Sequence, residues 1–158
     1  MVKDPKVNGF KCPSSPSHAS EGLLFGVVLR DTTRNSVAYL KHTTPITENL
    51  LASVHPVRPE EVFRVAGQCV EKQCKHFDGA HCRLAHRIVE VLEPVVDSLP
   101  RCMIRPTCRW WAEQGASACF RCPSIITCDV SPSAELAEAA NPEAKLKEPD
   151  PEVSPRII

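Results

Sequence analysis

Apolar residues form two runs with β propensity near the start of the chain. Residues 23–29 and 36–40 are rich in valine and leucine, and they flank the polar segment "RDTTRN". This pattern predicts a β-hairpin with a loop of about six residues. A two-stranded hairpin is marginally stable alone, so we expect it to pack on other elements. Residues 1–21, rich in proline and serine, are expected to be an irregular lead-in.

Helical spacing is clearest after the Asp78-Gly79 turn. Four apolar residues recur there with a helical period before Pro94 ends the element: Leu84, Ile88, Val91 and Leu92. Shorter helices are predicted over residues 48–53, 59–66, 108–114 and 133–140. Thr47 is a suitable cap for the first of these helices, and Pro59 is a suitable first residue for the second.

These elements predict a small cysteine-rich α+β domain over residues 1–130, in which the hairpin packs on short helices. Residues 131–158 read as an acidic Pro/Ala-rich tail that is loose and disordered. The net charge is +3 over residues 1–59, +1 over 60–128 and −4 over 129–158, which sums to zero. The chain therefore has no global attraction for nucleic acid or an anionic membrane.

The predicted core is thin. Aromatic residues are only 5% of the chain, and its 15 prolines cluster near both ends. Small cores often need disulfides or metals, so metal-bound loops are expected here. The first residues show no apolar signal-peptide core, and the longest apolar run, "GLLFGVVL", is too short to span a bilayer. We therefore expect a cytoplasmic protein that makes no membrane contact.

Nine cysteines are the main chemical signal: Cys12, Cys69, Cys74, Cys82, Cys102, Cys108, Cys119, Cys122 and Cys128. In a reducing cytoplasm, stable disulfides are rare, and such a pattern favours metal binding or catalysis. "CFRC", which contains Cys119 and Cys122, is a spacing that directs two thiolates toward one metal centre. The other spacings are long and irregular, which favours iron–sulfur clusters over zinc. We expect one or two clusters of the 4Fe-4S type.

Eight cysteines make two quartets. The preferred division places Cys12, Cys69, Cys74 and Cys82 in one site, and Cys102, Cys108, Cys119 and Cys122 in the other. Cys128 is then spare. A rival division has one cluster, held by Cys119, Cys122 and Cys128 with Cys102 or Cys108. Zinc, disulfides and plain buried thiols are the alternatives to a cluster.

Histidines offer a mixed Cys/His zinc site as a further alternative. His76 and His81 flank the turn between Cys74 and Cys82, although both also fit a solvated turn. A nucleophilic cysteine would need a nearby base, and proximity of Cys74 and His76 in sequence does not supply that geometry. The chain contains no phosphate loop, G-x-S-x-G or H-E-x-x-H motif, so no enzyme activity is predicted.

Two resemblances follow from the cysteine motifs. The "C-x2-C-x5-C" run with one upstream cysteine resembles the iron–sulfur motif of AddB-type nucleases. The catalytic residues of that family are not matched, so no nuclease activity is carried over. Residues 11–128, through "FRVAGQCVEKQCKHFDG" and "RPTCRWW", resemble small cysteine-rich bacterial proteins of unassigned role that are considered iron–sulfur proteins. That resemblance implies a self-contained domain and a bacterial source, and no activity.

The sequence therefore predicts an iron–sulfur protein that passes electrons to, or senses redox state for, a larger protein partner. The alternative is a zinc-stabilised adaptor without redox chemistry. A third reading is a nucleic-acid-associated cluster domain, which rests on five residues: Arg101, Arg105, Arg109, Trp110 and Trp111.

Overall fold

The computed structural model describes residues 9–31 and 35–144. Its strands are β1 (Lys11–Ser15), β2 (Leu23–Arg30), β3 (Asn35–Pro45) and β4 (Phe63–Gln68). Its α-helices are α1 (Glu48–Ala52), α2 (Pro59–Val62), α3 (Arg83–Val91), α4 (Arg109–Gln114), α5 (Ala116–Cys119) and α6 (Ala134–Ala140). Short 3₁₀ turns are η1 (Glu71–Gln73), η2 (Arg105–Thr107) and η3 (Cys122–Ser124). Within the described ranges, no helix combines the length and apolar character needed to cross a membrane.

The strands form one antiparallel sheet in the order β1-β4-β2-β3. The α+β class is confirmed, and so is the hairpin of β2 and β3. Two local predictions are wrong. Lys11–Ser15, expected to be irregular, forms β1. The helix expected over residues 59–66 ends at Val62, and the chain continues as β4. Pairing with β1 and β2 on both sides outweighs the weak helical pattern of this segment.

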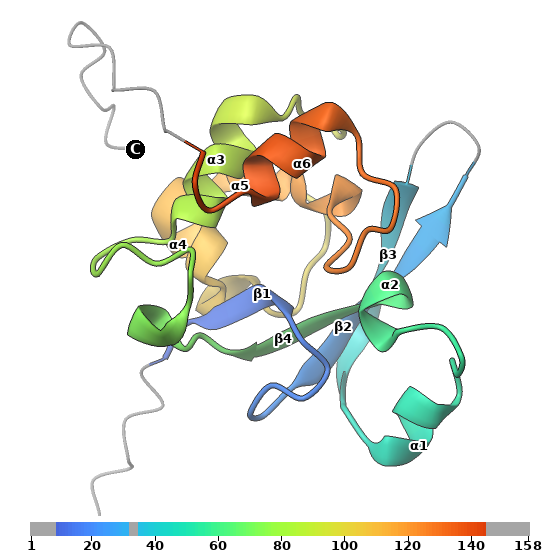
Figure 1. Ribbon diagram of the computed structural model, residues 1–158. Helices are drawn as coiled ribbons and strands as arrows, with labels where there is room; N and C mark the ends of the chain where they lie inside the picture. Colours follow the sequence, from blue (N-terminus) through green and yellow to red (C-terminus); the bar gives the residue numbers. More distant parts are fainter. Residues whose placement is uncertain (1–8, 32–34, 145–158) are drawn as a thin grey trace, which may run out of the picture.

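The two faces of β4 serve different parts of the molecule. Phe63 and Val65 pack with Leu24 in a small core on the face that α1 covers. Ala66 packs with Phe25 in the main core on the opposite face. Figure 1 shows α3, α4, α5 and α6 gathered on that side of the sheet. Because side chains alternate along a strand, Arg64 also points into this main core, where the cysteines lie.

The remaining helices follow the sequence pattern. Thr47 caps α1 by accepting a hydrogen bond from the Leu50 N–H (3.2 Å). α6, which the sequence places in the tail, packs against α3, and its Ala139 is buried. Arg87 Nε of α3 donates to the carbonyl of Ala139 (2.8 Å), which ties the two helices together. The last part of the expected tail, residues 145–158, lies outside the described residues.

Candidate metal centre

The cysteines line two separate cavities. We call Cys12, Cys69, Cys74 and Cys82 the first site, and Cys102, Cys108, Cys119 and Cys122 the second site. The first cavity is much larger than the second. All nine cysteines are free thiols. The members of each predicted cysteine quartet therefore line one cavity. Metal ligation by the quartets stays a prediction.

Cys128 lies on the wall of the first cavity, together with the first-site cysteines. It does not line the second cavity, where Cys119 and Cys122 are found. The rival division, which joins Cys128 to Cys119 and Cys122, therefore has no support from the arrangement of the described residues.

Cys12 is held in the first site by the edge pairing of β1 with β4, where it lies opposite Gly67. Ser15 Oγ donates to the Cys12 carbonyl (2.8 Å) and accepts a hydrogen bond from the Gly67 N–H (3.0 Å). A Cβ atom at position 67 would lie 2.5 Å from the Cβ of Ala19, so the close approach of this loop requires glycine. β1 thus brings the N-terminal cysteine to the other three.

Cys74 and Cys82 are placed by the turn that separates them. Asp78 Oδ1 accepts hydrogen bonds from the N–H groups of Ala80 (2.9 Å) and His81 (2.7 Å), which closes the turn. Cys82 then caps α3, and its sulfur accepts from the Ala85 N–H (3.5 Å). The Cys74 sulfur accepts from the N–H of His76 (3.4 Å). Both sulfurs therefore face backbone donors, as thiolate ligands commonly do.

Arg109 connects Cys69 to the acidic groups of the first site. Its buried guanidinium donates to Glu113 (3.0 Å) and Glu71 (2.9 Å), and its charge also interacts with the Cys69 thiol. Glu113 in turn accepts from the N–H of Cys82 (2.8 Å). The charge of Arg109 is therefore already balanced by two carboxylates before any metal is considered.

The two histidines expected as alternate ligands are placed differently. His76 lies on the wall of the first cavity, and its Nδ1 is 2.7 Å from Arg87 Nη2. Because guanidinium only donates, Nδ1 accepts this bond and the ring proton sits on Nε2. Burial, followed by the charges of Arg87 and Lys75, lowers the pKa of His76 to about 4. A protonated Nε2 does not ligate a metal, and His81 is exposed and does not line the cavity.

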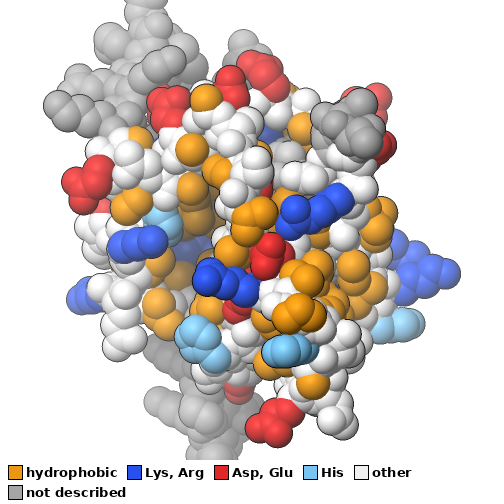
Figure 2. All heavy atoms as spheres, turned by 45° about the vertical axis from the view of Figure 1, so that its right-hand side comes forward, with side chains coloured by type: hydrophobic (Ala, Val, Ile, Leu, Met, Phe, Trp, Pro, Cys, Tyr) orange, Lys and Arg blue, Asp and Glu red, His pale blue; other side chains and the backbone are white. Residues whose placement is uncertain are grey.

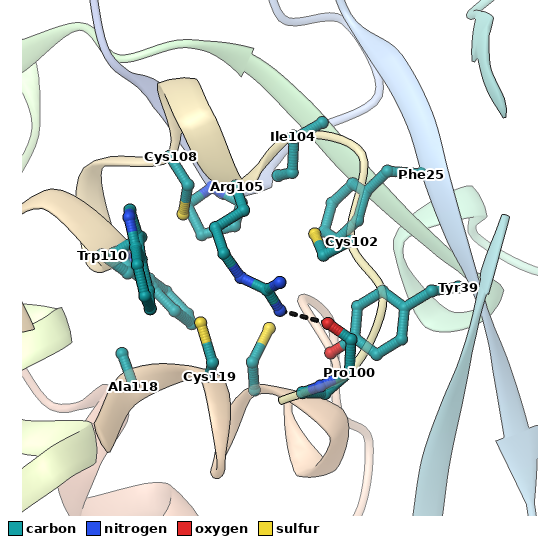
Figure 3. Close-up of a pocket in the computed structure, with 13 residues that line it drawn as sticks. Phe25, Tyr39, Pro100, Cys102, Ile104, Arg105, Cys108, Trp110, Ala118 and Cys119 are labelled. Carbon is teal, nitrogen blue, oxygen red and sulfur yellow. Dashed lines mark hydrogen bonds between the residues drawn. The ribbon is translucent and has the colours of Figure 1, made fainter. Parts of the chain in front are cut away.

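The second site is assembled from η2, α4, α5 and η3 (Figure 3). Cys108 precedes α4, and Cys119 and Cys122 lie at the end of α5 and the start of η3. Arg105 extends between Cys102 and Cys119 and donates to the carbonyl of Pro100. Its positive charge opposes the burial that raises the pKa of Cys119, and its buried Nε has no hydrogen-bond partner among the described residues. A cation thus reaches into this quartet.

Burial changes the acidity of the thiols in both sites. It raises the pKa of Cys82 and of Cys108 to about 12. It also raises the pKa values of Cys12, Cys102 and Cys119, and neighbouring cysteines of the same site add to the effect. Four ionised thiols in one cavity repel one another, so they need cations to compensate them. A bound metal supplies that charge and deprotonates its ligands.

Arg64 is a candidate site residue that the sequence pattern did not reveal. Its side chain is fully buried, and every N–H of its guanidinium donates a hydrogen bond. Four bonds go to the carbonyls of Pro13, Cys122 and Ile125, at 2.8–3.2 Å. The fifth runs from Nη2 to the Cys122 sulfur at 3.1 Å. The alternation of β4 could have revealed it, because Arg64 falls on the same face as the buried Ala66.

The two sites are neighbours. Trp110 is 1% exposed and lines both cavities. A backbone bridge joins Lys11, next to Cys12, to Cys108 of the second site. Arg64 makes a further connection, since it contacts the carbonyl that follows Cys12 and the sulfur of Cys122.

Among the described residues, no three His, Cys, Asp or Glu side chains lie close enough together to hold a single metal ion. Four thiolates on tetrahedral zinc lie within about 3.8 Å of one another, given a Zn–S bond of about 2.3 Å. Ligands of a multi-iron cluster bind different iron atoms and are spaced more widely. Ligation of either kind by the two quartets stays a prediction.

Comparison with protein-family models, with curated proteins and with solved structures found no match to this chain. The interpretation of the two sites accordingly rests on their own geometry and chemistry.

Proposed function

We propose that the protein binds two iron–sulfur clusters of the 4Fe-4S type, one in each site, and serves as an electron-transfer or redox-sensing accessory to a larger protein. One observation carries the proposal. The nine cysteines divide between two neighbouring cavities, with the first quartet and Cys128 in one and the second quartet in the other. Four thiolates are the usual ligand set of such a cluster, which supplies one-electron chemistry when it is bound.

The surroundings of the sulfurs support a cluster in each site. Backbone N–H groups face Cys74 and Cys82, and Arg64 and Arg105 approach Cys122 and Cys119. Hydrogen bonds to the sulfurs and limited solvent exposure are the means by which proteins stabilise clusters and set their potentials. In the second site, a cluster would displace the Arg105 guanidinium from the centre of the quartet to the cavity wall, where its charge would still face the sulfurs.

The proposed partner is a protein that docks near the second site. Leu99 and Met103 flank Cys102 and are 44% and 45% exposed, so they offer apolar contact beside a ligand. A redox accessory needs a cluster close to such a contact surface. The proposal includes the cytoplasmic location and bacterial source expected from the sequence, and it assigns no enzyme activity to the chain itself.

The zinc-stabilised adaptor is the alternative, and it would require the sulfurs of each quartet to draw closer together. The nucleic-acid reading has less support. Arg109 and Trp110 are buried, and Arg105 stacks over Trp111 at 5.5 Å. Figure 2 shows basic, acidic and apolar side chains interspersed on the face in view, without one continuous basic patch among the described residues there.

The test is anaerobic purification followed by a visible spectrum and determination of iron, acid-labile sulfide and zinc. The proposal predicts about eight irons and eight sulfides per chain, for two clusters of four. It also predicts a broad absorbance that dithionite bleaches. Zinc without sulfide would refute the redox function and leave the adaptor. Absence of all three would refute both.

A further inference from the structure

The two sites differ in the charges that contact their sulfurs. In the second site, Arg64 is completely buried and donates to Cys122 Sγ at 3.1 Å. Its other four N–H groups bond to neutral carbonyls. Among the residues that the structure describes, no carboxylate forms an ion pair with Arg64. The sulfurs are therefore the source of negative charge for this buried cation.

The pKa of Arg64 reflects the same interaction between its guanidinium and the Cys122 sulfur. Burial lowers the pKa of an arginine, but the Cys122 sulfur and the Tyr39 hydroxyl more than offset this, and the pKa of Arg64 is raised. Phe25 and Trp110 cover the guanidinium, with ring centroids 5.3 and 6.0 Å from its central carbon. Water is thus kept from the cation, and its field acts on the second site with little screening.

Arg105 adds a second positive charge. It lines the second cavity together with Cys102 and Cys119, and its charge acts on both thiols. Its other polar contact is the neutral carbonyl of Pro100, and its ring contact is Trp111. No carboxylate lines this cavity in the described part of the chain. The second site therefore faces two arginines without a local anion.

The first site is closer to charge balance. Arg109, which contacts Cys69, is paired with Glu71 and Glu113, and Glu113 lies near enough to raise the pKa of Cys82. Asp129 also lines this cavity. Arg87 is the other buried cation here; it bonds to the Ala139 carbonyl and to His76, and its charge also acts on Cys82. The exposed Lys75 is screened by solvent.

We propose that Arg64 and Arg105 give the second site a higher reduction potential than the first, so that a single electron added to the protein resides on the second site. Reduction adds one negative charge to a centre, which an adjacent buried cation stabilises and carboxylates destabilise. This inference rests on the proposed function, since it needs a cluster in each site. It assigns Arg64 as a positioning and tuning residue, because it acts through Cys122.

The test is an anaerobic redox titration of the cluster-loaded protein with dithionite as the one-electron reductant, followed by electron paramagnetic resonance. Signals are assigned with two half-site variants, Cys12→Ala/Cys82→Ala and Cys119→Ala/Cys122→Ala. In the unmodified chain, the second site should be reduced first, with at least a tenfold preference for the electron. For a one-electron couple, tenfold corresponds to about 59 mV.

Three variants separate electrostatics from folding. Arg105→Gln and Arg64→Met should each reduce the preference at least tenfold by lowering the second-site potential alone. Glu113→Gln retains an acceptor for the Cys82 N–H and should raise the first-site potential instead, so the test does not depend on the folding of Arg64→Met. Arg30→Gln is the charge-matched control, since Arg30 is exposed and pairs with Glu61 at 4.0 Å. It should change neither potential.

The outcomes distinguish the two proposals. Two loaded clusters that titrate together, or a first site that is reduced before the second, overturn this inference and leave the proposed function intact. Equal changes in the reduction potentials of both sites in Arg105→Gln would also overturn this inference. A chain that contains no iron and sulfide overturns the proposed function, and this inference with it.

Discussion

The sulfurs of Cys12 and Cys82 lie on the wall of one cavity, although Cys12 belongs to β1 and Cys82 caps α3. The negative charge that Cys12 would carry contributes to the raised pKa of Cys82. The first site therefore depends on a long-range contact, which forms only when β1 pairs with β4. The second site is built within one short stretch of the chain.

Removal of Cys12 and Cys82 should empty the first site alone. In Cys12→Ala/Cys82→Ala, we expect iron to fall from about eight to about four atoms per chain, because a four-cysteine cluster loses two ligands. Cys128→Ala is the matched control, since Cys128 lines the same cavity without belonging to the quartet. It should retain all the iron. Loss of iron in Cys128→Ala would show that the quartets are assigned incorrectly.

The metal-free chain should lose stability in alkaline solution. Folding raises the pKa of Cys82 and of Cys108 from 9.0 to about 12, so above pH 9 these thiols ionise in the unfolded chain before they ionise in the folded one. The unfolded state then binds fewer protons, and the free energy of unfolding falls as pH rises. The fall is up to about 1.4 kcal/mol per pH unit for each thiol between pH 9 and 12.

Denaturant titrations of the metal-free chain at pH 8 and about pH 10.5 measure this fall. The metal-loaded chain is the comparison for this pH dependence. Its cysteine ligands are already deprotonated, so they do not titrate between pH 9 and 12. Metal-free and loaded chains with the same pH dependence would contradict the burial of free thiols in the folded state.

His76 should be dispensable for metal binding. Its Nδ1 accepts a hydrogen bond from Arg87, which leaves a proton on Nε2. His76→Gln and the exposed-site control His81→Gln should both keep the iron and sulfide content of the unmodified chain. A selective loss of metal in His76→Gln would indicate a mixed Cys/His site in place of four cysteines.

Trp110 should support both sites at once. Its indole is 1% exposed and lines both cavities, whereas Trp111 is only partly buried. Trp110→Ala is expected to cost about 3–5 kcal/mol of unfolding free energy, since it removes a large buried aromatic. Trp111→Ala should cost clearly less. Unfolding curves give the stability, and equal losses in the two variants would contradict the central position of Trp110.

Local sequence signals predict part of this structure well. Thr47 marks the start of α1, the period of Leu84 and Ile88 marks α3, and the polar loop after β2 marks the hairpin. Each of these features depends on residues close together in sequence. The expected cysteine groups also coincide with the two cavities, because sequence order brings most members of each quartet together.

Long-range pairing explains what the sequence did not reveal. β1 and β4 are short and have weak local patterns, and they become strands by pairing with each other. Arg64 was missed for the same reason, since a residue assigned to a short helix over residues 59–66 has no evident contact with Cys122. The attachment of α6 to α3 depends on Arg87 and the Ala139 carbonyl, which no local pattern connects.

The central claim is that each quartet holds a cluster of several irons, and X-ray absorption at the iron and zinc edges of the anaerobically purified chain tests it most directly. We predict that iron is present, that each iron is surrounded by sulfur, and that a second shell of neighbouring iron atoms is visible. Zinc bound by sulfur with no metal neighbour, or iron bound by oxygen and nitrogen, would contradict the account.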